Sequence, residues 1–439
     1  MTRRPARLLG LVLALGCAGE SGPADADPAA LLRNRAAAAG VTAVGLAPAA
    51  DTALIRLGQA LFFDKVLSGN RDISCGNCHI PAYHTTDVMT LPIGTGGTGL
   101  APRRALGRGE FSARNVPELF NRGHPAWRRF FWDGRVELSD SGLVTPAGAA
   151  LPAGLSGPLA AQALFPMIAR AEMRGRPGEN GIADLPDADP RPMWDSIVAR
   201  VQSLPGYDTL ARAAFPARAT PITGVADLAN ALAAFVGTRW FLAHAPFDDF
   251  LAGDDAALSP AALRGGLLFF GRARCAACHR GPLLTDFEFH NVGIPELGPG
   301  VGGHPDQGRA AVSGQPADAH AYRTPSLRNV AHGPPYMHNG AYPDLQAAIR
   351  HYRDVRRSLA SFDTLGVDQR LRATLDLSPA AVAEIERTLD PRLAGATRLS
   401  DDEVADLLAF LLSLSDPRAA VLLGDVPRSV PSGLPVLEY

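Results

Sequence analysis

Lysine is almost absent from this chain: Lys65 is the only lysine among 42 basic residues, and the others are arginine. The basic residues are scattered and are balanced by 44 acidic residues, which gives a formal net charge of −2. Proteins that bind nucleic acid normally concentrate positive charge on one surface, so this pattern argues against a nucleic-acid partner. Cysteine is scarce too, because five cysteines in 439 residues are too few for a disulfide scaffold. The 46% of hydrophobic residues are enough for one large core or two.

Long apolar runs are missing, apart from a short one near the N-terminus. Residues 8–16 are apolar and follow three arginines, but they are too few to span a bilayer, which takes about 20 residues. The pattern predicts an export signal over residues 1–17 and a periplasmic mature protein. The run ends in Ala14-Leu15-Gly16-Cys17, which resembles a bacterial lipoprotein box, so Cys17 is expected to carry an outer-membrane lipid anchor. Cleavage by ordinary signal peptidase beyond Cys17, or Cys17 as a plain apolar residue, remains an alternative.

Four of the five cysteines fall in two motifs of the form C-x-x-C-H. They are Cys75-Gly76-Asn77-Cys78-His79 and Cys275-Ala276-Ala277-Cys278-His279. By chance, one match is expected in about a thousand such sequences and two in about a million. Residues three and four apart share one face of a helical turn, so two thiols can bind haem vinyl groups while the imidazole reaches the iron. The sequence therefore predicts two covalently bound c-type haems.

Other uses of paired cysteines fit less well. A four-cysteine zinc site would need the two pairs to converge, although about two hundred residues separate them and each carries a trailing histidine that zinc does not require. A thioredoxin-like motif would lie on a βαβ pattern, which surrounds neither copy.

Helical periodicity dominates the rest of the chain, and strand-like alternation is scarce. The fold class is therefore predicted as mainly α, with two cytochrome c-like haem domains and long irregular loops. Ser400 and Glu403 form a capping-box pattern at the start of one helix. The predicted helices cover residues 53–63, 225–240, 260–270, 345–355, 379–389 and 401–414. The expected divisions are a flexible tether over 18–50, haem domains over 51–248 and 249–420, and a tail over 421–439.

Several further segments give the chain a wider resemblance. From about Leu57 to Pro417 it resembles the bacterial dihaem cytochrome c peroxidase family, which includes the MauG-type enzymes. The segments that carry the resemblance are Phe131-Trp132-Asp133-Gly134-Arg135, Arg114-Asn115-Val116-Pro117, Gln162-Ala163-Leu164-Phe165-Pro166, Ala171-Glu172-Met173, Thr324-Pro325-Ser326-Leu327-Arg328-Asn329-Val330 and Tyr336-Met337-His338-Asn339-Gly340.

The resemblance implies that the N-terminal haem reacts with hydrogen peroxide and that the C-terminal haem passes or stores electrons. His79 is then the proximal ligand of the reactive haem. Many of these peroxidases close the opposite face with a histidine from a later loop, but this chain has Thr95 in the matching place. Threonine is a poor haem ligand, so a five-coordinate resting iron is expected. His84 is the nearest rival, and it is expected to contact the surface or a haem propionate instead.

The resemblance also assigns the residues around the reactive haem. Glu172 is the predicted acid–base residue, because splitting the peroxide bond requires moving a proton between its two oxygens. Gln162 and Pro166 precede it by ten and six residues, as in the MauG-type enzymes, and are expected to shape the pocket. Trp132 matches a tryptophan between the two haems that relays electrons. Read from the residues alone, Glu172 would be a solvated polar residue and Trp132 a core aromatic.

A calcium ion between the haems is a further implication of the resemblance. Asn115 matches its side-chain ligand, and Gly333 and Pro335 match positions that give backbone carbonyls. Glycine replaces a more usual threonine at one of these positions, but a carbonyl ligand does not depend on the side chain. Calcium accepts few protein oxygens together with several waters, so the ion is expected.

The ligand opposite His279 decides which branch of the family the chain resembles. Tyr352 stands where the peroxidases that use small cytochromes have methionine, and tyrosine is the MauG-type residue. An anionic phenolate stabilises oxidised iron and lowers the haem potential, whereas a thioether raises it. Met337 and His351 are competing ligands, although His351 would point about 100° away from Tyr352 on a helix.

The leading functional prediction is a periplasmic dihaem oxidoreductase of the MauG-like branch. Peroxide would react at the first haem, and a protein or small-molecule electron donor would be oxidised through the second. The alternatives are a cytochrome c peroxidase fed by a small cytochrome, and a dihaem electron-transfer protein without peroxide chemistry. The sequence is compatible with a homodimer and does not identify the donor.

Overall fold

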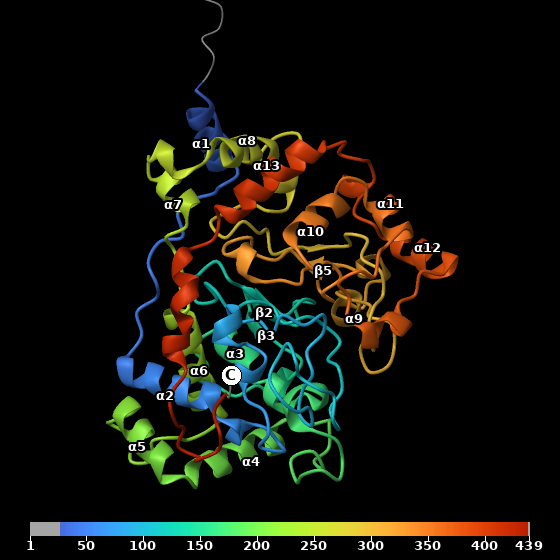
Figure 1. Cartoon of the computed structure of the whole chain (residues 1–439). Helices are drawn as coiled ribbons and strands as arrows, with labels where there is room; N and C mark the ends of the chain where they lie inside the picture. Colours follow the sequence, from blue (N-terminus) through green and yellow to red (C-terminus); the bar gives the residue numbers. More distant parts are fainter. Residues whose placement is uncertain (1–26, 438–439) are drawn as a thin grey trace, which may run out of the picture.

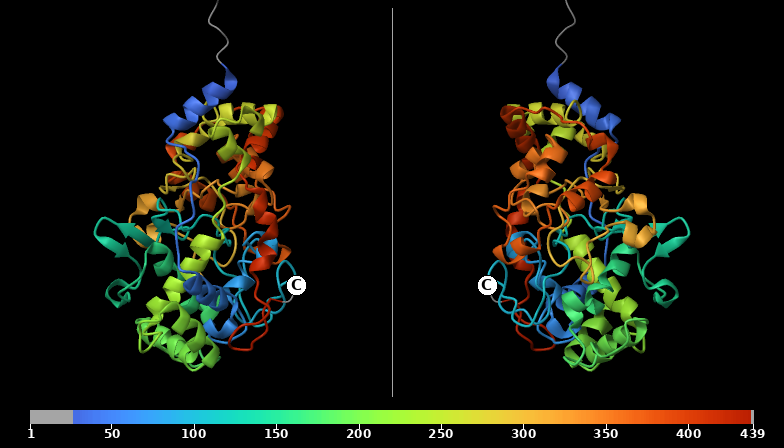
Figure 2. Two further views of the ribbon diagram at one scale, coloured as in Figure 1. Left: turned by 90° about the vertical axis from the view of Figure 1, so that its left-hand side faces the viewer. Right: turned by 90° about the vertical axis from the view of Figure 1, so that its right-hand side faces the viewer.

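The computed structural model describes residues 27–437, and the predicted signal residues and Cys17 lie outside this part of the chain. The fold is mostly helical with few short strands, and its main helices gather in two groups at opposite ends of the molecule (Figures 1 and 2). The lower group in Figure 1 contains α2 (Thr52–Phe63), α4 (Arg191–Gln202), α5 (Pro205–Ala214) and α6 (Val225–Arg239). The upper group contains α1 (Pro28–Ala38), α7 (Pro246–Leu251), α8 (Pro260–Phe269) and α13 (Asp401–Leu412).

The first core forms where α2 packs against α6. Asp51 caps α2 by accepting a hydrogen bond from the backbone nitrogen of Ala53 at 2.7 Å. Gly58 lets the two helices approach closely, because a Cβ there would overlap the carbonyl oxygen of Ala231 and lie 2.9 Å from the Cβ of Phe235. Leu57, Leu61 and Phe62 of α2 are buried in this core.

The second core repeats this arrangement with α8 and α13. A Cβ on Gly265 would overlap the carbonyl oxygen of Asp406 and lie 2.9 Å from the Cβ of Phe410. The predicted capping box is confirmed, since Ser400 accepts from the backbone of Glu403 at 3.2 Å and the Glu403 carboxylate accepts in return at 2.9 Å. The chain passes from the first core to the second between Leu242 and Phe247.

Short strands and small helices fill the region between the two groups. Strands β1 (Arg129–Phe130), β2 (Val136–Ser139) and β3 (Gly142–Val144) form an antiparallel sheet, and β4 (Phe289–His290) pairs with β5 (Tyr322–Arg323). The remaining helices are α3 (Pro158–Ala163), α9 (Ala310–Ser313), α10 (Leu345–His351), α11 (Val355–Ala360) and α12 (Pro379–Arg387). Long loops connect these elements, as predicted.

Both ends of the described chain pack more firmly than the sequence predicted. The expected flexible tether over residues 18–50 is wrong for residues 28–38, because these form α1, which buries Leu32 and Ala36 completely in the second core. The described part of the expected tail over 421–439, which ends at residue 437, folds back onto the first core, where the Asp425 carboxylate accepts from the indole of Trp240 at 3.0 Å. Each end of the chain therefore stabilises the half that lies farther away in sequence (Figure 1).

Most predicted helices match the structure within two residues at each end, and one does not. The predicted helix over residues 345–355 divides into α10 and α11, because the side chain of Asp354 caps a new helix by accepting from the nitrogen of Arg357 at 3.1 Å. This break places Tyr352 at the end of α10, just past His351.

Within residues 27–437, no single helix has the length and apolar character needed to cross a membrane. By length and composition alone, one bent pair meets the threshold, formed by Asp401–Leu412 and Pro417–Asp425.

Candidate active site

The first C-x-x-C-H motif forms a tight turn against α2. Its turn covers Cys75–Asn77, and the backbone nitrogen of His79 donates to the carbonyl of Cys75 at 2.9 Å. The Nδ1 atom of His79 lies 3.0 Å from the carbonyl oxygen of Thr85, and this contact leaves Nε2 free to bind a metal. Burial lowers the pKa of His79 to about 4, so its ring is neutral at pH 7. The motif therefore fits the attachment and ligation of a haem.

The second motif repeats the main backbone and histidine contacts of the first. The nitrogen of His279 donates to the carbonyl of Cys275 at 2.9 Å, and its Nδ1 lies 3.0 Å from the carbonyl oxygen of Leu284. In both copies a phenylalanine ring lies 6.4 Å from the histidine ring at an angle of 48°. These rings belong to Phe62 in the first copy and Phe269 in the second. The two motifs are therefore equivalent in backbone and in proximal packing.

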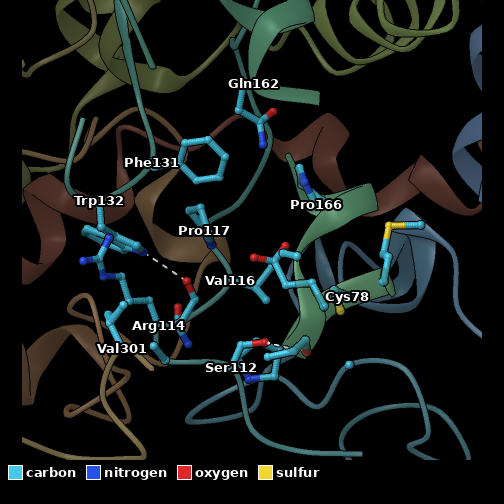
Figure 3. Close-up of a pocket in the computed structure, with 18 of the residues that line it drawn as sticks. Cys78, Ser112, Arg114, Val116, Pro117, Phe131, Trp132, Gln162, Pro166 and Val301 are labelled. Atoms are coloured by element: carbon cyan, nitrogen blue, oxygen red, sulfur yellow. Dashed lines mark hydrogen bonds between the residues drawn. The ribbon is translucent and has the colours of Figure 1, made fainter. Parts of the chain in front are cut away.

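A cavity of about 1410 Å³ opens beside the first motif. Small-molecule sites usually measure about 300–1,000 Å³, so this volume suits a prosthetic group with a small substrate. In Figure 3, Cys78, Gln162 and Pro166 lie on one side of the cavity, and Trp132 and Arg114 lie on the other. The predicted residues that line it together are Cys75, Cys78, His79, Asn115, Trp132, Gln162, Pro166 and Glu172.

Glu172 reaches this cavity from an unusual helical turn. It lies in a single π-helical turn, Arg170–Arg174, a geometry that is common at functional sites. Among residues 27–437, no donor forms a hydrogen bond with its carboxylate, whereas its carbonyl oxygen accepts from the nitrogen of Thr95 at 2.8 Å. Burial raises the pKa of Glu172, and the positive charge of Arg135 lowers it by a smaller amount. A free carboxylate with a raised pKa is suited to accepting and returning a proton.

The loop that carries Thr95 is fixed by hydrogen bonds that engage the Thr95 hydroxyl with two polar side chains. The Thr95 hydroxyl donates to the Asp72 carboxylate at 2.7 Å and accepts from the Asn70 amide at 2.9 Å. The nitrogen of Gly96 donates to the same carboxylate at 2.7 Å. Arg104 donates two further hydrogen bonds, to the carbonyl oxygens of Ile93 and Gly94. The resemblance to the family does not predict these contacts. The two side chains that bond Thr95 do lie in a short polar run, Asn70 to Asp72, that is visible in the sequence.

His84 is half-buried and packs against the later part of the chain. Its Nδ1 atom lies 3.1 Å from the carbonyl oxygen of Ala419. Its half-buried ring lies against that of His332, with a distance of 4.4 Å between ring centroids. His84 therefore joins the first motif to the later part of the chain.

Trp132 lies between the two halves at the edge of the cavity. Its indole nitrogen donates to the carbonyl oxygen of Asn115 at 3.0 Å (Figure 3). The backbone nitrogen of Asn115 donates in turn to the carbonyl of His338 at 2.7 Å. This chain of bonds connects the indole to the second half of the molecule.

The predicted calcium ligands lie on two loops that approach each other. The Asn115 amide nitrogen donates to the carbonyls of Met89 and Thr90 at 3.0 and 3.2 Å, which leaves its Oδ1 free for a cation. A Cβ built on Gly333 would lie 3.8 Å from Oε2 of Glu118, so the two loops are close. Amide and carbonyl oxygens are ligands that a hard cation accepts, and calcium at this place remains a prediction.

Tyr352 faces the second motif, whereas His351 does not. Burial raises the pKa of Tyr352, and the nearby thiols of Cys278 and Cys275 raise it further. A phenolate at this position therefore needs a cation beside it, which a ferric haem would provide. Both nitrogens of His351 are already engaged, at 2.9 Å from the Tyr342 hydroxyl and 2.7 Å from the carbonyl of Val292. Met337 packs in a separate cluster with residues such as Leu91.

A charged cluster beside the second motif was not predicted from the sequence. His290 lies between two carboxylates, with Nε2 3.1 Å from Asp286 and Nδ1 2.8 Å from Asp390. Burial alone would lower the pKa of His290, but hydrogen bonds to Asp286 and Cys278 raise it to about 10. Cys278, Asp286 and His290 could also hold a metal ion by their spacing, although Cys278 belongs to the haem motif. The spacing of Asp286 and His290, four residues apart, is the only local sign of the cluster.

Comparison with known proteins adds independent findings. Residues 52–256 match the family model of the di-haem cytochrome c peroxidases. The chain is 32% identical to the methylamine utilization protein MauG of Methylorubrum extorquens over 374 residues, covering 85% of this chain and 81% of that protein. It is 30% identical to the cytochrome-c peroxidase IdrP2 of a Pseudomonas species, covering 70% of this chain and 74% of that protein.

Solved structures agree with these sequence relatives. The crystal structure of a MauG-like protein associated with microbial copper homeostasis superposes with a TM-score of 0.59 at 27% identity. This match covers 86% of the present chain and 95% of the other. The two named relatives differ in branch but are almost equally similar, so identity alone does not choose between a MauG-type protein and a cytochrome-c peroxidase.

Proposed function

The chain belongs to the di-haem cytochrome c peroxidase family, and on that premise we propose that it couples two c-type haems to the reduction of hydrogen peroxide. Overall, peroxide takes up two electrons and two protons and leaves as two molecules of water. The arrangement that carries the proposal is the shared cavity of His79, Gln162, Pro166 and Glu172. His79 would ligate the first iron through Nε2, and Thr95, tied to Asp72, would leave the other face open.

The haem, when bound, supplies the iron that binds peroxide and transfers electrons to it. The protein's part is to move the proton. Glu172 accepts a proton from the peroxide oxygen nearest the haem and returns it to the outer oxygen, which can then leave as water. Pro166 limits the space, and the Gln162 amide is placed to hydrogen-bond a bound oxygen. The raised pKa of Glu172 makes its carboxylate a stronger base, which favours uptake of the proton.

Electrons would reach the first site through Trp132 and the second motif. The indole lies at the cavity edge and is tied through Asn115 to the second half of the chain. His279 and Tyr352 would ligate the second iron from opposite sides. A phenolate ligand lowers the potential of that iron, so this site would store oxidising equivalents instead of accepting electrons from a small cytochrome. This feature favours a MauG-like oxidase of a protein or small-molecule donor.

A cytochrome-c peroxidase is the second candidate, and the similarity to IdrP2 supports it. The two candidates differ at Tyr352. In a peroxidase fed by a small cytochrome, the second haem must be a good electron acceptor, which a phenolate ligand opposes.

The proposal has three further parts. Calcium would bind at Asn115, Gly333 and Pro335, the protein would be exported to the periplasm, and Cys17 would carry a lipid anchor.

The test is to mix the resting ferric holoprotein with one equivalent of hydrogen peroxide and follow the absorption of both haems. The proposal expects a high-spin signal from the first haem before mixing and a rapid change at both haems after it. A tyrosinate signature in the electron paramagnetic resonance spectrum of the second haem would support the MauG-like branch. Two six-coordinate haems that do not respond to peroxide would contradict the proposal and favour a plain electron-transfer protein.

A further inference from the structure

The segment that carries Trp132 is held by two arginines from the other half of the chain. The carbonyl oxygens of four consecutive residues, 131–134, each accept a hydrogen bond from Arg309 or Arg323. The Arg323 side chain donates to Phe131 at 3.1 Å, and its backbone nitrogen donates to Trp132 at 2.7 Å. The Arg309 guanidinium donates to Asp133 at 3.0 Å and to Gly134 at 3.2 Å. Four consecutive carbonyls are thus fixed from across the interface.

The backbone of this segment is strained, so its conformation depends on contacts such as those from the two arginines. Phe131 has a φ of +63°, in the left-handed region that residues with a Cβ rarely adopt. Gly134 has a φ of +68°, and a Cβ there would overlap the ring of Phe289. Such conformations persist only where the surrounding contacts determine them, and they gather at functional sites.

The two arginines are themselves fixed. Arg323 is buried, and its guanidinium donates to the carbonyl of Thr324 at 3.0 Å. Arg309 lies 4.2 Å from the centre of the Phe289 ring, in cation–π contact. A guanidinium held at two points can position a carbonyl more firmly than a flexible ammonium group.

A buried ion-pair network fixes the side chain of the residue next to Trp132. Arg114 donates to the Asp133 carboxylate at 2.6 Å and to the two oxygens of Asp306 at 2.7 and 2.8 Å. The Arg114 guanidinium lowers the pKa of Asp306 to about 2, against the effect of burial. Asp306 therefore stays charged at neutral pH, and it links the segment to the second half a second time.

We propose that Arg309 and Arg323 are positioning residues that hold Trp132 in the orientation needed for electron transfer between the two haems. The proposal rests on the function proposed above, because it assigns Trp132 to the electron path. Loss of the guanidinium of Arg309 would release the carbonyls of Asp133 and Gly134 and let the strained turn relax. The indole would then move while both haem motifs stay in place.

The test measures electron transfer between the haems directly, without peroxide. In half-reduced holoprotein, carbon monoxide is released from the ferrous first haem by a light flash, and the redistribution of the electron between the two haems is followed by absorbance. Arg309→Met is expected to slow this movement about tenfold, since small misplacements of a working group have large effects on rate. Arg309→Lys, which keeps a donor, is expected to recover part of the rate. The midpoint potentials of both haems should not change.

Arg129 provides a matched control. It also crosses the interface, donating to the carbonyl of Phe287 at 3.1 Å and pairing with Glu288 at 2.8 Å, but it touches no carbonyl of residues 131–134. Arg129→Met should therefore transfer electrons at the wild-type rate. Equal rates in Arg309→Met and wild type, or equal slowing in both methionine variants, would overturn the proposal. If the wild-type protein ignores peroxide, the proposed function fails, whereas the flash measurement still tests the arginines.

Discussion

The two haem motifs occupy nearly identical frames and very different surroundings. Each lies against a glycine-mediated helix pair, α2 with α6 and α8 with α13, with the same ring geometry at its histidine. Burial also raises the pKa of Cys75 and of Cys275 to about 12. The frame therefore serves to hold a haem, and it does not distinguish the two sites.

The surroundings of the two motifs separate them. The first opens into a large cavity in which the only group with a free carboxylate and a raised pKa, among the described lining residues, is Glu172. The second lies beside Tyr352 and a network of charges around His290. In the proposed function, the first motif would serve proton transfer to a small substrate, and the surroundings of the second would control its redox state. We infer from this comparison that the loops around each motif, and not the repeated helix pair, determine what chemistry the site can perform.

The largest effect on rate is expected from a change at Glu172, which lies where the surroundings of the two motifs differ most. Glu172→Gln keeps the shape of the side chain but removes its capacity to accept a proton, so the reaction with hydrogen peroxide should slow by about 10²–10⁴. Stopped-flow absorbance of the first haem measures this rate. The second haem should keep its spectrum, because Glu172 does not contact the second motif.

Glu110→Gln is the control for this change. Glu110 also lines the cavity but is partly exposed and pairs with Arg176 at 3.2 Å. Its replacement should leave the peroxide rate unchanged. A wild-type rate in Glu172→Gln, or similar losses in both variants, would remove Glu172 from the proposed proton path.

The next effect tests whether the two frames are truly equivalent. Gly58→Ala and Gly265→Ala each place a methyl group against a backbone carbonyl of the facing helix. Such overpacking costs about 1–3 kcal/mol of unfolding free energy, and the cost should be similar in the two variants. Thermal or denaturant unfolding measures it. Gly395→Ala, where a Cβ would meet nothing within 4 Å, is the control. A large loss in only one variant would break the equivalence.

Much of this repeated frame could be predicted from the sequence because its signals are local. Helical periodicity located α6 over Val225–Arg239, and Ser400 with Glu403 marked the start of α13. The haem motifs are short contiguous patterns. The resemblance to the family then pointed to Gln162 and Glu172, and both residues line one cavity.

The features that the sequence did not predict all depend on contacts between distant residues. The helix around Leu32 looked like part of a tether because most of its apolar residues are alanine, and its partner lies more than two hundred residues away. The His290 cluster needs Asp390, one hundred residues later. The arginines that hold residues 131–134 are scattered in sequence, and their common target appears only in three dimensions. Local patterns cannot report such pairs.

A smaller effect is expected from exchanging the ligand that separates the second site from that of an ordinary peroxidase. Tyr352→Met replaces a phenolate by a thioether, so the potential of the second haem should rise, by an amount on the order of 0.1 V. Spectroelectrochemical titration measures it. Tyr342→Phe is the control, because the Tyr342 hydroxyl contacts His351 and Ser358 instead. An unchanged potential in Tyr352→Met would show that another residue ligates this iron.

The smallest effect concerns the pH dependence of the first site. Only ionised Glu172 can accept a proton, and burial raises its pKa, so the peroxide rate should fall as the pH drops through that raised value. The charge of Arg135 acts in the opposite direction, and Arg135→Met should therefore move the midpoint of the rate profile upward, by less than about one pH unit. Arg170 lies two residues from Glu172 but pairs with Asp187 at 2.7 Å, so Arg170→Met should leave the midpoint in place. A downward shift in Arg135→Met, or the same shift in both variants, would contradict this account of the proton acceptor. The second haem should show no such profile, because Glu172 lies in the cavity beside the first motif.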